Sequence, residues 1–266
     1  MGQRISTVER LSVTWRQKKY LLFPVVSILV LLYSACSKEP EADIKVTLLQ
    51  INDVYEIEAV SGGKLGGLAR VATIRNQLLE ENPNTLTIMA GDFFSPSALG
   101  TAKVDGKRLD GKQMVAVLNA IGLDYAAFGN HEFDIKKEPF YSRLKESEFK
   151  WIACNVFDEE GKLFPGTLTN ELLSFSNQHG SVFTLGITGI TMNENDPDYV
   201  SFSDPVSSIK TEVELMREHA DAILAITHFD FVDDQSIAER VPEIDLIIGG
   251  HDHENMIIRR GENFTP

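Results

Sequence analysis

From residue 44 onward, short apolar runs alternate with amphipathic segments along the chain. The apolar runs have the length and composition of buried strands and lie at residues 44–50, 85–90, 125–128, 151–156, 182–190, 222–227 and 246–248. Between them, residues 68–78, 114–121 and 207–219 carry apolar side chains at helical spacing. This alternation predicts an α/β fold in which at least some strands are parallel. No internal repeat or linker interrupts residues 44–266, which favours one domain, and the acidic segment 193–204 predicts a long surface loop.

Side chains that can bind metal ions follow five of the apolar runs, at the point where each run ends. They are Asp53, Asp92, Asn130, His131, His228, His251 and His253. Because the ends of strands in open α/β sheets converge on one rim, we expect these side chains to lie close together. Carboxylate, amide and imidazole ligands suit Mn, Zn, Fe or Co, and the absence of a cysteine among them argues against a structural zinc site. One such residue alone is more often a turn or surface residue, but five segments together predict a catalytic metal site.

The first 35 residues have the organisation of an export signal. Basic residues between Arg4 and Lys19 precede an apolar run at 20–33. This run is shorter than a typical membrane span and has the proportions of a signal-peptide core. We therefore expect residues 1–35 to be a signal peptide that is removed from the mature protein.

The end of the apolar run resembles a bacterial lipoprotein box. It reads Leu-Tyr-Ser-Ala-Cys, with Cys36 as the lipidated residue and Tyr33 where such boxes usually carry leucine, and a polar tether at 36–43 follows. We therefore expect an exported protein of the bacterial cell envelope, in the periplasm or as an outer-membrane lipoprotein, held to the membrane through Cys36. The alternative is a plain signal anchor with an incidental cysteine.

Charge and cysteine content exclude some functions. The chain of 266 residues has a formal net charge of −14, which offers the backbone of a nucleic acid no extended basic surface, so we expect no nucleic-acid partner. The two cysteines, Cys36 and Cys154, lie in such different surroundings that we expect no disulfide between them. Cys154 is expected to be a small buried apolar residue.

The polar segments at the strand ends resemble, in their order and spacing, the motifs of the calcineurin-like metallophosphatases. The segments are Asp53-Val54-Tyr55, Gly91-Asp92, Gly129-Asn130-His131-Glu132, Thr227-His228 and Gly249-Gly250-His251-Asp252-His253. The strings GNHEFD and GGHDH, with GGLAR at 66–70, resemble the bacterial 5′-nucleotidase and UDP-sugar hydrolase branch. The resemblance implies a four-layer α/β/β/α sandwich of two mixed sheets, with residues 44–266 as the metallophosphoesterase catalytic domain.

The resemblance also implies a role for each matching residue. Two divalent metal ions are expected, bridged by Asp92. Asp53 and His253 would bind the first ion, and Asn130, His228 and His251 the second. His131 would face the phosphoryl group, oriented by Asp134 in a His–Asp dyad, while a metal-activated hydroxide attacks phosphorus in line.

Tyr55 departs from the family pattern, because the first motif usually has histidine at this place. A phenol, with an ordinary pKa of about 10, is a poor ligand at neutral pH unless a metal strongly favours the phenolate. Tyr55 is thus either a phenolate ligand or no ligand at all. We favour the second alternative, which predicts a weaker first metal site.

Substrate identity is less constrained by the sequence. In the family resembled, a second domain holds the nucleotide, and only thirteen residues follow His253 here, so we expect a catalytic domain truncated at its C-terminus that lacks the substrate domain. The favoured activity is hydrolysis of nucleotide phosphomonoesters. A 2′,3′-cyclic nucleotide phosphodiesterase and a nucleotide-sugar pyrophosphatase are the alternatives within this class. An alternative of another class is an exported metal- or ligand-binding lipoprotein whose catalytic site has decayed.

Overall fold

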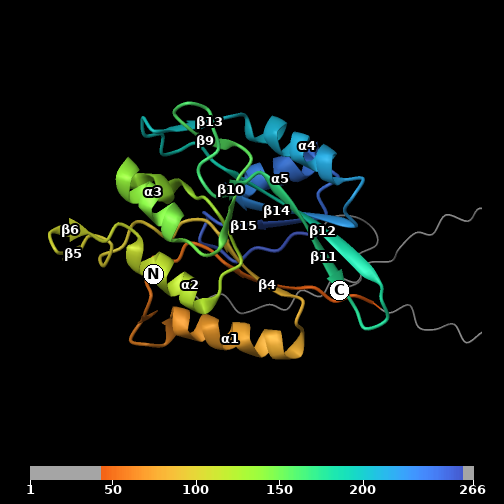
Figure 1. The fold of residues 1–266 in the computed structure, drawn as a ribbon, viewed down its shortest axis with the longest axis horizontal. Helices are drawn as coiled ribbons and strands as arrows, with labels where there is room; N and C mark the ends of the chain where they lie inside the picture. Colours follow the sequence, from red (N-terminus) through yellow and green to blue (C-terminus); the bar gives the residue numbers. More distant parts are fainter. Residues whose placement is uncertain (1–42, 260–266) are drawn as a thin grey trace, which may run out of the picture.

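A computed structural model describes residues 43–259 (Figure 1). The expected signal peptide, Cys36 and most of the polar tether lie outside the described residues. No helix among the described residues combines the length and the apolar character that crossing a membrane would need.

Two sheets form the centre of the molecule. The first contains β1 (Thr47–Ile51), β4 (Thr85–Ala90), β7 (Tyr125–Ala127), β8 (Lys150–Ile152) and β10 (Thr167–Leu168), in the order β1-β4-β7-β8-β10. The second contains β11 (Asn170–Ser176), β12 (Val182–Thr191), β14 (Ala222–His228) and β15 (Leu246–Gly249), in the order β11-β12-β14-β15. Every described pair in the first sheet is parallel, so the mixed character that we expected for both sheets is confined to the second, where β11 and β12 form an antiparallel hairpin.

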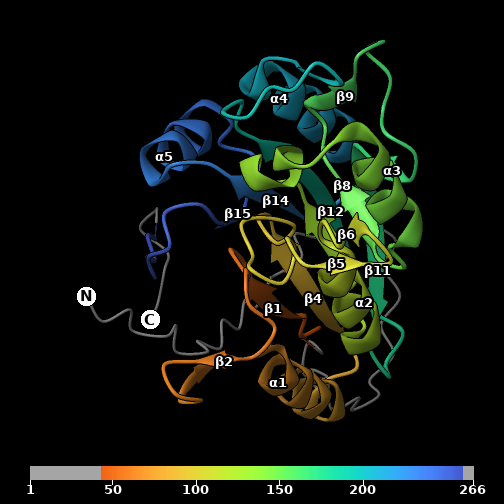
Figure 2. The same ribbon diagram turned by 90° about the vertical axis from the view of Figure 1, so that its left-hand side faces the viewer.

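Helices cover the outer face of each sheet. Figure 2 shows α1 (Leu68–Glu81), α2 (Lys112–Ile121) and α3 (Lys137–Glu146) along one side of the sandwich, and α4 (Pro205–Met216) and α5 (Phe231–Arg240) along the opposite side. The arrangement is therefore the expected α/β/β/α sandwich. The sequence favours the observed helix ends. Helix α2 is followed by Gly122, which adopts the left-handed conformation common after a helix. Helix α4 begins after Asp204, whose carboxylate accepts a hydrogen bond from the Ser207 amide at 2.8 Å.

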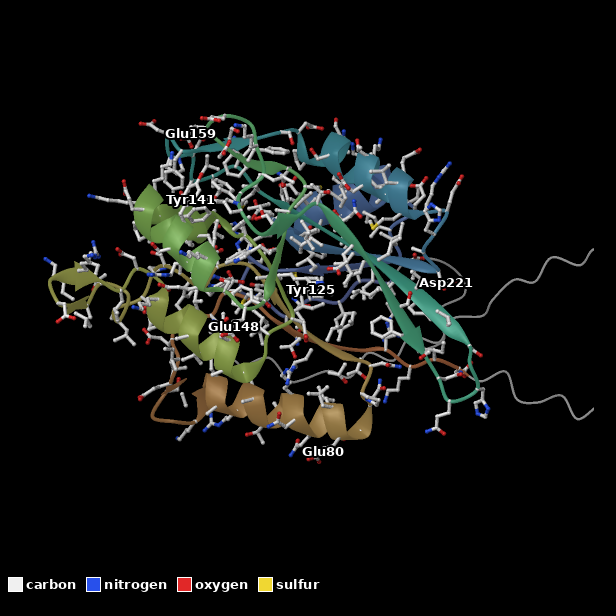
Figure 3. The ribbon with its side chains drawn as sticks, in the orientation of Figure 1. Glu80, Tyr125, Tyr141, Glu148, Glu159 and Asp221 are labelled. Atoms are coloured by element: carbon white, nitrogen blue, oxygen red, sulfur yellow. The ribbon has the colours of Figure 1, made fainter. Side chains whose placement is uncertain are left out.

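Three apolar clusters lie between these four layers, and the strands supply alternate residues to them. Ile88 of β4 packs between the two sheets, whereas its neighbour Met89 packs beneath the helices of the first sheet. In β14, Leu224 faces the first sheet and Ala225 faces α4. This alternation follows from the two-residue period of a strand, so each strand secures two interfaces. Side chains fill the space between the layers, where the hydroxyl of Tyr125 donates to Glu171 at 2.8 Å (Figure 3).

Some elements differ from the expectation. The apolar run at 151–156 divides into β8 and β9 (Val156–Asp158), because β9 leaves the first sheet and pairs with β13 (Val200–Phe202). The segment 193–204 is therefore not one continuous loop. Helices α3 and α5 and strand β11 were not predicted, since their apolar residues are few and the rest of each element is polar.

Short elements complete the described part of the chain. Hairpins form between β2 (Ala59–Val60) and β3 (Leu65–Gly66) and between β5 (Lys103–Val104) and β6 (Lys107–Arg108), and a 3-10 helix, η1 (Asn130–Asp134), follows β7. The carboxyl ends of β1, β4, β7, β14 and β15 lie at one rim, where Gln50 Nε2 donates to the Gly249 carbonyl at 2.6 Å and links the two sheets. His228 is the last residue of β14, and the other predicted site residues within the described part of the chain lie on the segments that follow β1, β4, β7 and β15.

Candidate functional site

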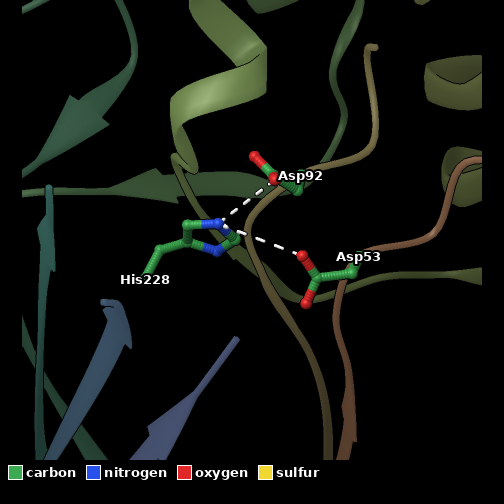
Figure 4. Close-up of side chains that lie close together, drawn as sticks. All are labelled: Asp53, Asp92 and His228. Carbon is green, nitrogen blue, oxygen red and sulfur yellow. Dashed lines mark ion pairs between the residues drawn. The ribbon is translucent and has the colours of Figure 1, made fainter. Parts of the chain in front are cut away.

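Asp53, Asp92 and His228 converge at this rim from three strands (Figure 4). Nε2 of His228 lies 3.2 Å from Oδ2 of Asp92 and 4.0 Å from Oδ1 of Asp53. Among the described residues these three supply ligand atoms that all lie within 4.8 Å of one another. Their side chains are 5%, 1% and 0% exposed respectively, so two carboxylates meet one imidazole almost out of contact with solvent.

The hydrogen bonding of His228 leaves one ring nitrogen for a ligand. Nδ1 lies 2.7 Å from the Ala90 carbonyl, which can only accept, so Nδ1 carries a proton. Nε2 faces Oδ2 of Asp92 at 3.2 Å but makes no hydrogen bond of good geometry among the described residues, and Oδ1 of Asn130 is buried without a partner there. Burial opposes the charged form of His228, but Asp92 outweighs it and raises the pKa of His228 to about 9. Two carboxylates, the unpartnered oxygen of Asn130 and an imidazole nitrogen that can bind metal once it gives up its proton form a donor set that suits a divalent cation, so these residues fit a metal site.

His251 and His253 follow β15 and reach the same place. Nε2 of His253 lies 3.2 Å from Oδ1 of Asp53, and the backbone N–H of His251 donates to Oδ2 of Asp53 at 2.9 Å. The His251 ring stands edge-on to that of His228, with centroids 5.3 Å apart, and its Nε2 lies 3.5 Å from Oδ1 of Asp230. Asp53 thus contacts both residues, the ring of His253 and the backbone of His251, while the ring of His251 faces Asp230.

Four of the predicted ligands have a left-handed backbone, which is uncommon for residues other than glycine. The φ angles are 53° at Asp53, 63° at Asp92, 82° at His251 and 55° at His253. Such conformations cost free energy and concentrate at functional sites, where the surrounding fold holds them. Here all four occur on segments that follow the strands of the rim.

The hydroxyl of Tyr55 touches three of the other site residues. It lies 3.0 Å from Oδ2 of Asp92, 3.3 Å from Nε2 of His253 and 3.4 Å from Oδ1 of Asp53. Burial, and then the charges of Asp92 and Asp53, raise the pKa of Tyr55 well above its ordinary value. Tyr55 is therefore a neutral phenol in this arrangement, and its one proton can serve only one of the three acceptors at a time.

His131 and Asp134 form a pair at the edge of the site. Nδ1 of His131 lies 2.7 Å from Oδ2 of Asp134, while Nε2 turns toward Asp92 and lies 4.0 Å from its Oδ2. The backbone N–H of His131 donates to the other oxygen of Asp92 at 2.9 Å. Burial lowers the pKa of His131, but the hydrogen bond with Asp134 and the charge of Asp92 outweigh it, and the net shift is upward.

Glu132 supports the site through backbone hydrogen bonds. Its buried carboxylate accepts hydrogen bonds from four backbone N–H groups, those of Asp92, Phe93, Phe94 and Gly129, at 2.6 to 3.1 Å. Burial and the neighbouring charge of Asp92 raise the pKa of Glu132 to about 7, against the effect of these donors. Since four amides of two segments meet at one side chain, Glu132 fixes the backbone that carries Asp92.

Two motif glycines allow this close approach. A Cβ at Gly91 would lie 2.5 Å from Nδ1 of His228, and a Cβ at Gly129 would overlap the carboxylate of Asp92. Both positions therefore require glycine for space, and Gly91 also has a φ of 81°.

Three aromatic residues and Cys154 belong to the core instead of the site. Phe93, Phe94 and Trp151 are fully buried, with the ring centroids of Phe93 and Trp151 stacked 5.4 Å apart, so these three are packing residues. Cys154 is buried as predicted, and burial raises the pKa of its thiol to about 12.

A comparison of the sequence with known protein families agrees with the motifs and with the four-layer fold. The family model of the calcineurin-like phosphoesterases matches residues 46–255. The chain belongs to the calcineurin-like phosphoesterases.

Individual members of this family are moderately similar to the chain. A 5′-nucleotidase of Rattus norvegicus is 28% identical over 254 residues, which cover 88% of this chain and 41% of the relative. An apyrase of Tabanus yao is 30% identical over 230 residues, which cover 79% of this chain and 39% of the relative. The chain thus spans about two fifths of the length of these relatives.

Solved structures of calcineurin-like phosphoesterases have the same fold. The 5′-nucleotidase precursor from Thermus thermophilus superposes with a TM-score of 0.66 at 26% identity, covering 83% of this chain and 44% of that chain. The calcineurin-like phosphoesterase YfkN from Bacillus subtilis superposes with a TM-score of 0.65 at 25% identity, covering 79% of this chain and 72% of that chain. The sandwich is therefore the fold of this family.

Proposed function

We propose that this chain is the catalytic domain of a metal-dependent phosphoesterase that hydrolyses nucleotide phosphomonoesters. The observation that carries the proposal is the meeting of Asp53 and Asp92 with Nε2 of His228 at a buried rim. The reaction class is supported by the membership of the chain in the calcineurin-like phosphoesterases. A nucleotide as substrate is supported by the 5′-nucleotidases among the similar proteins.

Two divalent ions, of Mn, Zn, Fe or Co, would be held by the residues around this rim. Asp92 would bridge them, with Asp53 and His253 on one side and Asn130, His228 and His251 on the other. When bound, the ions supply an activated water and neutralise the charge of the phosphoryl group. The buried oxygen of Asn130, which lacks a hydrogen-bond partner among the described residues, supports this assignment.

The protein's own residues complete the reaction. In hydrolysis, the oxygen of water bonds to phosphorus, the ester bond breaks, and the leaving oxygen takes a proton. His131 would donate that proton from Nε2, and the contact of its Nδ1 with Asp134 at 2.7 Å supports this role. Asp134 keeps the ring in one orientation and favours the charged imidazolium that donates.

Export to the cell envelope is a separate part of the proposal. It rests on the sequence of residues 1–36, which precede the described residues. Removal of residues 1–35 and lipidation of Cys36 would anchor the catalytic domain at a membrane surface. Labelling of the expressed chain with a radioactive fatty acid tests this, with a Cys36→Ser control that should take up none.

Hydrolysis of a panel of phosphoesters tests the activity, with the products separated by chromatography, because cleavage of a cyclic diester or of a nucleotide-sugar pyrophosphate releases no inorganic phosphate. The full chain is assayed with added Mn²⁺ and again with chelator, on a nucleoside 5′-monophosphate, a 2′,3′-cyclic nucleotide, a nucleotide sugar and an aryl phosphate. Hydrolysis of the 5′-monophosphate that chelator abolishes is the expected result. Preference for the cyclic nucleotide or the nucleotide sugar would change the substrate class, and a folded, metal-loaded chain without any turnover would favour the binding protein.

A further inference from the structure

Two side chains of the segment that follows β12 bind η1 and the residue after it. Nδ2 of Asn195 donates to Oδ1 of Asp134 at 2.7 Å and to the backbone carbonyl of Asn130 at 3.0 Å. The hydroxyl of Tyr199 donates to the carbonyl of Ile135 at 2.7 Å. Asn195 therefore joins the first and the last residue of η1, and Tyr199 holds the residue that follows.

The orientation of the Asn195 amide follows from its partners. A carboxylate and a carbonyl oxygen only accept hydrogen bonds, so the atom facing both must be the nitrogen with its two protons. The other oxygen of Asp134 is occupied by Nδ1 of His131 at 2.7 Å. A continuous series of hydrogen bonds thus runs from Asn195 through Asp134 to His131.

Asp134 needs such a partner to hold one orientation. Its side chain is 30% exposed, and among the described residues Asn195 is the one that donates to the oxygen left free by His131. Without this donor the carboxylate can rotate and exchange its partner for water, and Nε2 of His131 then loses its fixed direction toward Asp92.

We propose that Asn195 is a positioning residue of the phosphoesterase reaction. It fixes the Asp134 carboxylate, and through it the direction in which His131 presents its proton to the leaving oxygen. The inference rests on the proposed function, because it assigns a role within the same site. It also gives the acidic segment 193–204 a part in catalysis that its sequence did not indicate.

Leaving-group dependence separates this role from a purely structural one. Nitrophenolate leaves with little need of a proton, whereas the alkoxide of a nucleoside needs one. Asn195→Ala should therefore lower kcat for a nucleoside 5′-monophosphate about 10-fold while changing kcat for p-nitrophenyl phosphate about 2-fold or less, since general acids contribute about 10²–10⁴-fold in full. KM should change little for either substrate.

Tyr199→Phe is the matched control. It removes a hydrogen bond of similar length from the same segment to the same part of the chain, but this bond does not reach the His131–Asp134 pair. The ratio of the two kcat values should stay at the wild-type value in Tyr199→Phe. An equal fall for both substrates in Asn195→Ala would overturn the proposal, since that result indicates general damage to the site.

A double-mutant cycle tests whether Asn195 acts through Asp134. In an Asp134→Ala background, Asn195→Ala should cause no further loss on the nucleoside 5′-monophosphate, because the carboxylate that it positions is absent. Losses that multiply independently would contradict the proposed route.

A measurement without turnover keeps this inference apart from the proposed function. In the full chain labelled with ¹⁵N-histidine, the Nδ1 proton of His131 is assigned with a His131→Gln variant. Its exchange with water should be faster in Asn195→Ala than in wild type and unchanged in Tyr199→Phe. An unchanged exchange rate in Asn195→Ala would overturn the inference, whereas a wild-type chain that hydrolyses no phosphoester would overturn only the proposed function.

Discussion

The hydroxyl of Tyr55 lies 3.0 Å from Oδ2 of Asp92, the carboxylate that we propose as the bridge between two metal ions. Tyr55 occupies the place of a histidine in the first family motif, so it sits where a ligand is expected. A neutral phenol in this position competes as a hydrogen-bond donor for the same oxygens that would bind the first ion. The effect of having tyrosine instead of histidine at this position can be measured as metal affinity.

Metal binding should be stepwise in the wild type, with the first site weaker, and Tyr55→His should strengthen that site. Replacing the phenol with an imidazole adds a neutral nitrogen ligand beside Asp53 and His253. Isothermal titration of the metal-free chain with Mn²⁺ measures both affinities. Equal affinities in the wild type, or a phenolate-to-iron charge-transfer band in the purified protein, would show instead that Tyr55 binds metal.

His131→Ala should lower turnover of a nucleoside 5′-monophosphate by about 10²–10⁴-fold, the usual contribution of a general acid. The metal content should stay the same, because Nδ1 of His131 is bound to Asp134 and its Nε2 is 4.0 Å from Asp92. Steady-state kinetics and elemental analysis of the same preparation check both expectations. A variant that loses one metal equivalent would make His131 a ligand.

Glu132→Gln should destabilise the fold although the two side chains have nearly the same shape. The carboxylate accepts from four backbone N–H groups, whereas the NH₂ of glutamine would face some of them as a second donor. A buried group left unsatisfied costs about 1–3 kcal/mol, so we expect a loss of at least about 2 kcal/mol in the free energy of unfolding. Urea unfolding at pH 8 measures it, with Glu138→Gln on the exposed surface of α3 as the control. A loss no larger than that of the control would refute the role of Glu132.

Asp124 should make the free energy of unfolding decrease as the pH rises. Burial raises the pKa of Asp124 above its ordinary value, although its carboxylate accepts from the Thr87 amide at 2.7 Å. The folded state thus holds the proton of Asp124 more tightly than the unfolded state, in which the pKa of this carboxyl is about 3.9. The protonated carboxyl therefore contributes fully to the free energy of unfolding below about pH 3.9, and this contribution is lost as the pH rises through the pKa of the folded state. Asp124→Asn keeps an acceptor for Thr87 and has no such proton.

Relative to wild type, Asp124→Asn should therefore become more stable as the pH rises from about 4, until Asp124 is ionised in the folded state. Urea unfolding of both proteins in chelator, at a series of pH values, gives the difference. A difference that is constant with pH, or that changes in the opposite direction, would contradict the burial of this carboxyl.

The sequence contained enough information for the layers and for most of the site, because these depend on local signals. Strand β4 lies at the predicted residues, and the apolar runs before Asp53, His228 and His251 end within one or two residues of their predicted ends. Each motif combines a strand end, a glycine and a polar side chain over a few residues, and the order of the motifs identifies the family. The predicted ligands could thus be placed on one rim before their contacts were known.

Other features depend on contacts between distant parts of the chain. Asn195 donates to a residue 61 positions away, and Glu132 accepts from amides 38 to 40 positions away, so no local pattern marks either role. The pairing of β9 with β13 likewise joins two short segments that resemble loops. Helix α5 was missed because its surface is largely polar and only Ile237 is buried.

The central claim is that Asp53, Asp92 and His228 hold the ions that make phosphoester hydrolysis possible. Stripping the full chain of metal and adding Mn²⁺ in steps, with phosphate release from a nucleoside 5′-monophosphate and bound metal measured at each step, tests it most directly. We predict that activity appears with the second equivalent of metal in the wild type, and that Asp92→Asn binds neither ion tightly and stays inactive. Two tightly bound equivalents in Asp92→Asn, or wild-type turnover that does not depend on added metal, would contradict the account.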